Sequence, residues 1–433
     1  MNITDKADNQ KGDLKETGGE GPERVVLAAA DTGAYDVDAS LEELCALCET
    51  AGAVVLAEVV QRREKPDRAG YLGAGKLAEA QELCERLGAD TLVVDDERTG
   101  STQKNMENAV GVDVVDRTTL ILDIFAQAAK TAEGKLQVEL AQLNYRLPRL
   151  AGAGTALSRI GGSASGGAGG RIGTRGPGET KRESYRRYIR ARISLLKDRL
   201  AEVEKRRAVT RVRRQKAGVP VVALVGYTNV GKSSLLNSLT GADVLAENKL
   251  FATLDPTVRS LAVGELQQIV LVDTVGFVSR LPHNRVDAVK STLEEARYAD
   301  LILEVLDASS AAWPEQQQVT RDVLAGIGAA DIPRITVFNK CDLVDTAAAL
   351  PGLPVSAATG AGLDALLAQV SKLLAERVVR CTLKLPFDQL SLLSFLRARG
   401  NVLSEEYAAD GVLVTATVER AAFAKVEQYV TGV

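Results

Sequence analysis

Short apolar runs alternate with segments of helical period in the first quarter of the chain. Apolar runs bounded by turn residues predict strands, whereas apolar positions spaced three or four apart predict helices. Ser40 is a suitable N-cap for a helix that extends to Thr50. This alternation predicts a small α/β domain over 24–115, with strands at 25–30, 53–60 and 91–94 and helices at 40–50 and 77–87.

The same alternation returns between residues 219 and 375. Strands that are buried on both faces read as continuous apolar runs, and such runs lie at 219–225, 269–272, 301–306, 335–338 and 354–356. A second α/β domain is therefore predicted over 218–376. The remaining residues, 377–433, predict a small α+β domain with strands at 382–385 and 411–418, a helix near 388–398 and a final helix.

Between these domains the period is helical on both sides of a glycine-rich segment. Residues 118–150 carry leucines at helical spacing, at 136, 140, 143 and 147. Residues 180–216 carry an apolar seam at 189, 193, 196, 200 and 203. Eleven glycines fall within 151–178, too many for regular structure. We predict an antiparallel helical pair over 116–217, joined by a glycine-rich loop and held by packing along the seam.

Composition sets bounds on the class of protein. A chain of 433 residues predicts about three domains at roughly 150 residues each. No apolar stretch approaches the roughly 18 residues needed to cross a bilayer, so no stable membrane insertion is expected. Residues 1–23 hold six acidic and three basic side chains without an apolar core, which predicts a disordered tail and no secretion signal. The five cysteines form no disulfide framework, and we expect a monomer in the reducing cytoplasm.

The pattern G-x-x-x-x-G-K-S follows the apolar run 219–225 directly. Such a loop between a strand and a helix holds phosphate oxygens with inward-facing N–H groups. Lys232 would contribute positive charge to the β and γ phosphates, and the hydroxyl of Ser233 would ligate Mg²⁺. The start of the following helix adds its positive dipole end. The predicted phosphate-binding residues are Gly226, Tyr227, Thr228, Asn229, Val230, Gly231, Lys232 and Ser233.

A second glycine-rich segment, Gly70 to Leu77, fits the same spacing but lacks two requirements. Leu77 stands where the metal-binding hydroxyl is needed, and the polar residues 61–68 before the segment do not predict a buried strand. We interpret it as a glycine-rich turn that opens a helix.

An Asp-x-x-Gly sequence begins 41 residues beyond the lysine of the phosphate loop and directly follows the strand at 269–272. The carboxylate of Asp273 can hold a water of Mg²⁺, and the N–H of Gly276 can contact the γ phosphate. We expect Lys232 and Gly276 to be the catalytic groups, and the segment adds Asp273, Thr274, Val275 and Gly276 to the site.

The base of the nucleotide is predicted by the sequence Asn-Lys-Cys-Asp, which follows the strand at 335–338. The carboxylate of Asp342 can accept both N1–H and N2–H of guanine, and adenine offers no such pair. Asn339 can join neighbouring loops, and the stem of Lys340 can cover the ring. GTP is therefore favoured over ATP, with a base pocket formed by Asn339, Lys340, Cys341, Asp342, Ser356, Ala357 and Ala358.

A threonine between these elements should reach Mg²⁺ only when the γ phosphate is present. Thr253 and Thr257 are both candidates, and spacing alone does not separate them. The segment contributes Phe251, Ala252, Thr253, Leu254 and Asp255 to the predicted site.

The complete set of segments resembles the HflX family of ribosome-associated P-loop GTPases. The matching segments are residues 251–257, 273–277 and 281–283 and the end of the glycine-rich loop at 173–180. The resemblance covers nearly the whole chain. It implies a cytoplasmic GTPase that binds the large ribosomal subunit and its rRNA, and that can split stalled or idle ribosomes. It also implies Thr253 as the second protein ligand of Mg²⁺, beside Ser233. The stretch 161–170 is longer here than is usual in the family.

Phe277 stands where Ras-type GTPases carry the glutamine that orients the attacking water. A phenyl ring cannot hydrogen-bond water, so hydrolysis should be slow unless another group or a partner assists. The resemblance implies stimulation by the ribosome. Asn229 is similar to the asparagine of GTPases that use K⁺ as an additional positive charge; alternatively, it only braces the loop.

Charge is distributed unevenly along the chain. Residues 171–216, which we call the basic arm, contain 17 Lys or Arg and 5 Asp or Glu, whereas the whole chain has a net charge of −4. The phosphates of RNA would attract this arm in a salt-dependent way, and Tyr185 and Tyr188 could stack on exposed bases. Arg159, Arg171 and Arg175 extend the positive charge into the glycine-rich loop, which could equally be a passive linker.

Two other functions stay open at this point. The first half of the chain could remodel RNA, with ATP, independently of the GTPase domain. Alternatively, the chain could be a GTP switch that docks a protein partner away from the ribosome.

Cys45 and Cys48 have metal-like spacing but no further ligands beside them, which favours packing on a helix. His283 is the single histidine and is expected in a switch segment, without an acid–base role.

Overall fold

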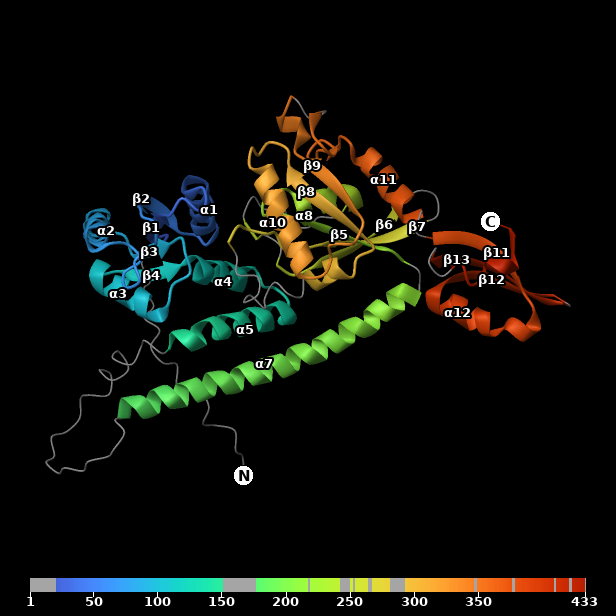
Figure 1. Ribbon diagram of the computed structural model, residues 1–433, viewed down its shortest axis with the longest axis horizontal. Coiled ribbons are helices and arrows are strands. Elements are labelled where there is room, and N and C mark those ends of the chain that lie inside the picture. Colours follow the sequence, from blue (N-terminus) through green and yellow to red (C-terminus); the bar gives the residue numbers. More distant parts are fainter. Residues whose placement is uncertain are drawn as a thin grey trace. The chain divides into compact units, whose positions relative to one another are not determined.

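The structure is a computed structural model that describes residues 21–150, 177–216, 219–241, 250–251, 254–263, 267–280, 293–345, 349–375, 378–408, 410–419 and 423–432 (Figure 1). The chain forms two compact units. The first contains residues up to Asp96 and Asn105–Asp116, and the second contains Glu97–Lys104 and Arg117–Val433. All but the last three residues of the expected disordered tail, and the glycine-rich loop up to residue 176, lie outside the described residues.

The first unit is built around a parallel four-stranded sheet in the order β2-β1-β3-β4. This confirms an α/β arrangement, because β1 is buried along nearly its whole length and pairs with strands on both sides. Helix α3 and strand β4 were not predicted from the sequence. The elements are β1 (Arg24–Asp31), α1 (Val37–Thr50), β2 (Val54–Arg62), α2 (Ala74–Leu87), β3 (Thr91–Val94), α3 (Gly100–Val110) and β4 (Asp113–Asp116).

Two local predictions in this unit require correction. The N-cap of α1 is Asp36, whose carboxylate accepts from the N–H groups of Asp38 and Ala39. Ser40 lies one turn inside the helix, and its hydroxyl donates to the buried Asp95 at 2.7 Å. Strand β2 extends through the polar residues 61 and 62, because an edge strand tolerates polar side chains.

The glycine-rich segment from Gly70 to Leu77 is a turn that leads into α2, as the sequence predicted. Gly73 caps the helix, and its N–H donates to the side chain of Gln61 at 2.8 Å. The α1 segment also has the expected packing role: Cys48 is fully buried and Cys45 is partly exposed. Among the described residues, no group of three or more His, Cys, Asp or Glu could hold a metal ion.

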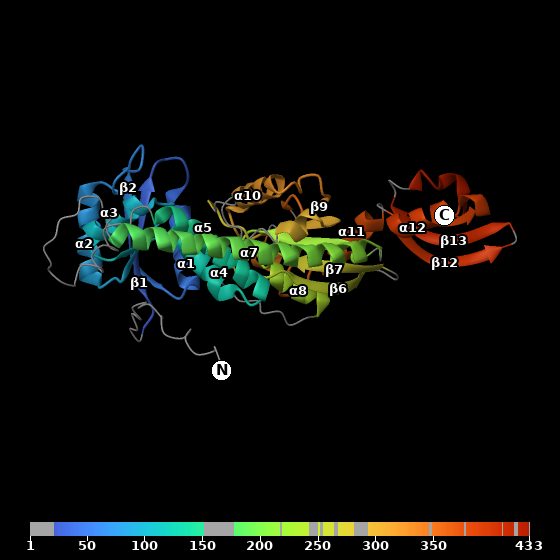
Figure 2. The ribbon, with the colours of Figure 1, turned by 90° about the horizontal axis from the view of Figure 1, so that it is seen from below.

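The second unit begins with three helices, α4 (Arg117–Ala128), α5 (Ala132–Arg149) and α7 (Pro177–Lys216). The helical run predicted over 118–150 is two helices, because Thr131 caps α5 by accepting from the N–H of Gly134 at 2.9 Å. We call the join between them, residues 129–134, the α4–α5 elbow. Figure 1 and Figure 2 show α7 running alongside α5.

The predicted apolar seam holds α5 against α7. Its buried centre consists of Leu140, Ile189, Ile193 and Leu196. Ion pairs join Glu139 to Arg192 at 2.6 Å and Glu133 to Arg207 at 2.9 Å. Since the partner numbers rise on α7 as they fall on α5, the helices are antiparallel. None of the helices described is long and apolar enough to span a membrane.

A six-stranded sheet follows, in the order β10-β9-β8-β5-β7-β6. All pairs are parallel except β6 with β7. Strand β6, which was not predicted, pairs with the neighbouring β7 at the sheet edge. The elements are β5 (Val221–Gly226), α8 (Lys232–Thr240), β6 (Thr257–Val263), β7 (Gln267–Asp273), β8 (Leu301–Asp307), α10 (Trp313–Gly326), β9 (Arg334–Asn339), β10 (Leu353–Pro354) and α11 (Leu363–Ala375).

The last part of the chain is an antiparallel sheet in the order β12-β13-β11-β14, with α12 packed on it. The predicted final helix is wrong in the described part: the chain there forms a short 3-10 turn, Glu427–Tyr429, and then β14, which pairs with β11. Strand β12 was not predicted. The elements are β11 (Val378–Leu385), α12 (Ser391–Arg399), β12 (Gly400–Ala408), β13 (Gly411–Glu419) and β14 (Val430–Gly432).

Candidate nucleotide-binding site

The G-x-x-x-x-G-K-S sequence forms the connection between β5 and α8, as predicted (Figure 1). Gly226 and Gly231 have φ angles of +156° and +87°, which side chains rarely adopt. A Cβ on Gly226 would also collide with the carbonyl oxygen of Val305, and one on Gly231 would collide with the amide of Asn339. The two glycines therefore let this loop lie against the ends of β8 and β9.

Lys232 is the first residue of α8 and is only 7% exposed. Its ammonium group donates to the carbonyl oxygens of Gly226 at 3.2 Å and Tyr227 at 2.6 Å. Burial lowers the pKa of Lys232 to about 8, and the charge of Asp273 partly opposes this shift. The protein thus places a poorly solvated cation directly at its phosphate loop, where an anion would stabilise the charged form.

Two oxygen-bearing side chains lie next to this lysine. Asp273, fully buried at the end of β7, accepts from the hydroxyl of Ser233 at 2.6 Å. Thr274 is turned away and donates to the carbonyl of Leu224 at 2.6 Å. A carboxylate beside a hydroxyl is the hard-oxygen donor set that Mg²⁺ prefers, so the residues present fit this ion.

The segment after Asp273 lies against the phosphate loop. A Cβ on Gly276 would stand 2.7 Å from Cα of Thr228 and 3.0 Å from Nζ of Lys232, so this position has no room for a side chain. Phe277 is fully buried, and its backbone N–H donates to Gly226 at 3.1 Å. The N–H of Ser279 donates to the hydroxyl of Tyr227 at 2.5 Å. We call residues 273–280 the second switch segment.

Asn339 connects the loops around the predicted base pocket. Asn339 is the last residue of β9, and its side chain is only 2% exposed. The amide nitrogen donates to the carbonyl of Val230 at 2.9 Å, and the amide oxygen accepts from the N–H of Ala357 at 3.0 Å. Lys340, with a φ of +64°, donates to Asp307 at 2.6 Å. Asp342 is exposed in a short 3-10 turn, so the guanine preference predicted for it would not depend on burial of the carboxylate before binding.

The segment predicted to carry the nucleotide-sensing threonine is described only in part. Ala252 and Thr253 lie outside the described residues, so the role of Thr253 stays a prediction. Thr257 begins β6 and is paired with Asp273 of β7. A residue that pairs within a β-sheet is a poor candidate for a Mg²⁺ ligand that must move when the γ phosphate is lost. We call residues 250–257 the first switch segment.

The described residues of the first switch segment contact helix α4 and the α4–α5 elbow. Phe251 is 3% exposed, and its ring packs edge-on against Phe125 of α4 at 4.7 Å. The carboxylate of Asp255 accepts from the N–H groups of Lys130 and Thr131, both at 2.9 Å, and from the hydroxyl of Thr131. A Cβ on Gly134 would collide with this carboxylate.

The second switch segment reaches the same helices. The guanidinium of Arg117, the first residue of α4, donates to the hydroxyl of Ser279 at 3.5 Å. Sequence reasoning gave no role to Arg117, Phe125, Lys130, Thr131 or Gly134. The N-cap pattern at Thr131 was visible in the sequence, but its partner Asp255 lies 124 residues away.

The basic arm corresponds largely to α7. Tyr185 and Tyr188 are 47% and 66% exposed, as the predicted stacking on bases would require. Part of the arm is occupied by helix packing, because Arg192 and Arg207 form ion pairs with α5.

Some predicted features lie outside the described residues. They are the segment 281–283, which includes His283, and the arginines of the glycine-rich loop.

Four family models match consecutive parts of the chain. They are described as GTP-binding GTPase N-terminal (residues 38–126), GTP-binding GTPase Middle Region (128–214), 50S ribosome-binding GTPase (221–340) and HflX C-terminal domain (343–427).

Curated relatives agree with these matches. GTPase HflX of Caldanaerobacter subterraneus subsp. tengcongensis is 46% identical over 409 residues, which is 94% of each chain. GTPase HflX of Escherichia coli K12 is 42% identical over 355 residues, 80% of this chain and 82% of the other. A crystal structure of a GTP-binding protein from Sulfolobus solfataricus with GDP is 25% identical, covering 82% of this chain and 99% of that one, with a TM-score of 0.43.

Proposed function

Because the chain belongs to the HflX family of GTPases, we propose that it uses Mg²⁺ and GTP to bind the large ribosomal subunit and to separate stalled or idle ribosomes. The family match over 221–340 is to a ribosome-binding GTPase model, which supports the ribosome as the partner. The reaction is hydrolysis of GTP to GDP and phosphate.

The site residues take the following roles in this proposal. The loop Gly226–Ser233 holds the phosphates, Lys232 adds charge to the β and γ phosphates, and Gly276 offers its N–H to the γ phosphate. Ser233 and Thr253 would hold Mg²⁺, which when bound would neutralise charge that develops on the phosphates. Asn339 and Asp342 select guanine. Asn229 is exposed, with a φ of +60°, and is the proposed contact for K⁺. Equal hydrolysis rates in potassium and sodium buffers would exclude that contact.

One observation carries the step from nucleotide binding to ribosome binding. Both switch segments are attached to the helices next to the basic arm, through Asp255 at the elbow and Ser279 at Arg117. An ordered segment around the γ phosphate would therefore favour one arrangement of α4 and α5, and α5 in turn packs along α7. GTP would in this way set the position of the surface that meets rRNA.

The proposal is tested by sedimentation of the protein with large ribosomal subunits under GDP and under a non-hydrolysable GTP analogue, at two salt concentrations. We expect tighter binding with the analogue, and weaker binding at the higher salt with either nucleotide. Light scattering of 70S ribosomes after addition of the protein and GTP measures separation of the subunits. Equal binding under both nucleotides, or constant scattering, would contradict the respective part of the proposal.

A further inference from the structure

The side chain of Thr228 holds an unexplained polar atom. Thr228 is the third residue of the phosphate loop and is 6% exposed. Its hydroxyl oxygen is buried and has no hydrogen-bond partner among the described residues. Leaving a buried hydroxyl unsatisfied costs about 1–3 kcal/mol, so such a group calls for a functional or structural explanation.

This side chain lies where the phosphate loop meets the second switch segment. The backbone N–H of Thr228 donates to the carbonyl of Phe277 at 2.8 Å. A Cβ placed on Gly276 would stand 2.8 Å from the methyl carbon of Thr228 and 3.0 Å from the ammonium of Lys232. Thr228, Gly276 and Lys232 therefore surround one small region, the region assigned to the γ phosphate in the proposed function.

The neighbouring position cannot provide a polar side chain there. Phe277 is fully buried, and both of its backbone groups are occupied, by Gly226 and by Thr228. The residue that orients water in Ras-type enzymes is thus replaced by an apolar side chain packed in the core. Thr228 is the adjacent residue of the phosphate loop that carries a hydroxyl, and rotation about its Cα–Cβ bond would bring this hydroxyl to the place of the methyl carbon that faces Gly276.

We propose that the hydroxyl of Thr228 is a catalytic group for GTP hydrolysis, accepting a hydrogen bond from the attacking water and donating one to the γ phosphate. Water attacks the γ phosphorus, the bond to the β–γ bridging oxygen breaks, and GDP leaves with the electron pair. The proton of the water passes to a γ-phosphate oxygen, giving inorganic phosphate. This inference rests on the proposed GTPase function and deepens it.

Thr228→Val tests the role because valine keeps the branched shape and removes only the hydroxyl, whereas Thr228→Ser keeps the hydroxyl. We expect Thr228→Val to lower the single-turnover hydrolysis rate about a hundredfold, the lower end of the effect of one transition-state hydrogen bond. Affinity for GDP with aluminium fluoride should fall in the same proportion, whereas affinity for GDP alone should change less than about twofold. Thr228→Ser should stay within about fivefold of the wild-type chain in both measurements.

Each outcome decides the question. A Thr228→Val chain with the wild-type rate and unchanged affinity for GDP with aluminium fluoride would overturn the proposal. If Thr228→Val loses GDP affinity as well, Thr228→Ala serves as the second variant: normal GDP binding with a lost rate supports the proposal, and any other result overturns it. Failure of the proposed function itself would be recognised separately, because the wild-type chain would then show no heat of GDP binding.

Discussion

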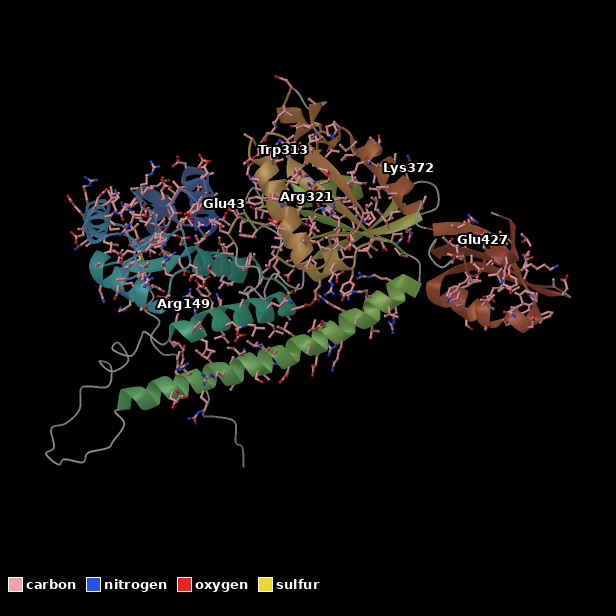
Figure 3. The ribbon with its side chains drawn as sticks, viewed as in Figure 1. Glu43, Arg149, Trp313, Arg321, Lys372 and Glu427 are labelled. Carbon is pink, nitrogen blue, oxygen red and sulfur yellow. The ribbon has the colours of Figure 1, made fainter. Side chains whose placement is uncertain are left out.

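At the residue scale, two buried charged side chains of the six-stranded sheet differ in how they are compensated. Glu304 of β8 is fully buried and has three partners, Gln317 at 2.8 Å, Arg321 at 3.2 Å and Thr336 at 2.9 Å. Arg321 projects from α10, the helix that begins at Trp313 (Figure 3). Among the described residues, Lys232 hydrogen-bonds only to carbonyl oxygens, and its pKa is depressed. The partners of a satisfied buried charge offset its desolvation, whereas an undercompensated cation favours binding of an anion.

The depressed pKa of Lys232 predicts proton uptake when a nucleotide binds. In the free protein the pKa is about 8, so at pH 8.5 most molecules carry neutral Lys232. Bound phosphates would raise the pKa well above 8.5, and roughly three-quarters of a proton should be taken up. At pH 6.5 the lysine is already charged and uptake at this group should vanish.

Calorimetry of GDP binding in buffers of different ionisation enthalpy measures this uptake. At pH 8.5 the phosphates of GDP are already ionised, so the uptake measured there reports Lys232. At pH 6.5 the terminal phosphate, whose second pKa is about 6, still carries part of its proton and releases it on binding, which adds to the difference between the two pH values. No proton uptake at pH 8.5 would show that the lysine is charged in the free protein.

Asp342→Asn should change which base is bound. The carboxylate accepts two donors of guanine, whereas an amide presents one donor and one acceptor, which suits xanthine with its oxygen at position 2. We expect GTP affinity to fall at least a hundredfold and xanthosine triphosphate affinity to rise. Competition against a fluorescent GDP measures both, and Asp345→Asn, an exposed residue of the same loop, is the matched control. Unchanged GTP affinity would remove Asp342 from the base pocket.

At the scale of elements, the α4–α5 elbow is capped twice. Thr131 satisfies the N–H of Gly134 within α5, and Asp255 of the first switch segment satisfies the N–H groups of Lys130 and Thr131. A carboxylate at a helix N-terminus also interacts favourably with the helix dipole. This contact depends on Gly134, because any larger residue would collide with the carboxylate.

Gly134→Ala should therefore release the first switch segment although it favours the helix. Alanine is better than glycine in a helix by about 0.5–1 kcal/mol, so a loss of function could not be assigned to an unstable α5. We expect the amides of Lys130 and Thr131 to lose protection from hydrogen exchange roughly tenfold to a hundredfold, as expected for loss of hydrogen bonds to a charged group. The GTP dependence of ribosome binding should weaken in parallel.

The matched control is Gly75→Ala, which lies in the first turn of α2 with open space around it. It should leave exchange at the elbow and ribosome binding unchanged. If Gly134→Ala behaved like Gly75→Ala, the capping contact would play no part in coupling the switch to the helices.

At the scale of the whole molecule, charge is separated along the chain. The basic arm carries a net +12, so the other 387 residues carry −16. A chain with an overall charge of −4 can therefore still offer a strongly positive surface to phosphates. The exposed residues of α7 are the candidates for this contact, because Ile189, Ile193 and Leu196 face α5.

Charge reversal of Arg186, Arg187 and Arg190 should weaken ribosome binding at low salt and flatten its salt dependence. Each phosphate contact that is lost should lower the slope of log affinity against log salt by about 1. Reversal of Lys65, Lys372 and Arg380, all exposed and outside the arm, changes the net charge equally and serves as the control. Equal effects of the two triple variants would indicate general attraction, and no effect of either would favour a protein partner.

Local pattern and chain order were sufficient to predict the strands and the loop that form the candidate nucleotide site. The phosphate loop, Asp273 and Asn339 each follow an apolar strand, and strand ends on a parallel sheet gather at one edge. The elements missed have weak patterns. Helix α3 is mostly polar with a few buried residues such as Met106 and Val110, and β6 is half exposed at an edge, where polar residues are tolerated.

The sequence by itself determined which chemistry the protein is suited to, because a glycine loop, a lysine, a hydroxyl and a carboxylate predicted to select guanine act through their own local geometry. Only the tertiary structure decided what that chemistry is connected to. Asp255 reaches Thr131 across 124 residues, and Thr228 meets Gly276 through packing of two loops. Such contacts are set by the way in which whole elements pack, and no local periodicity records them.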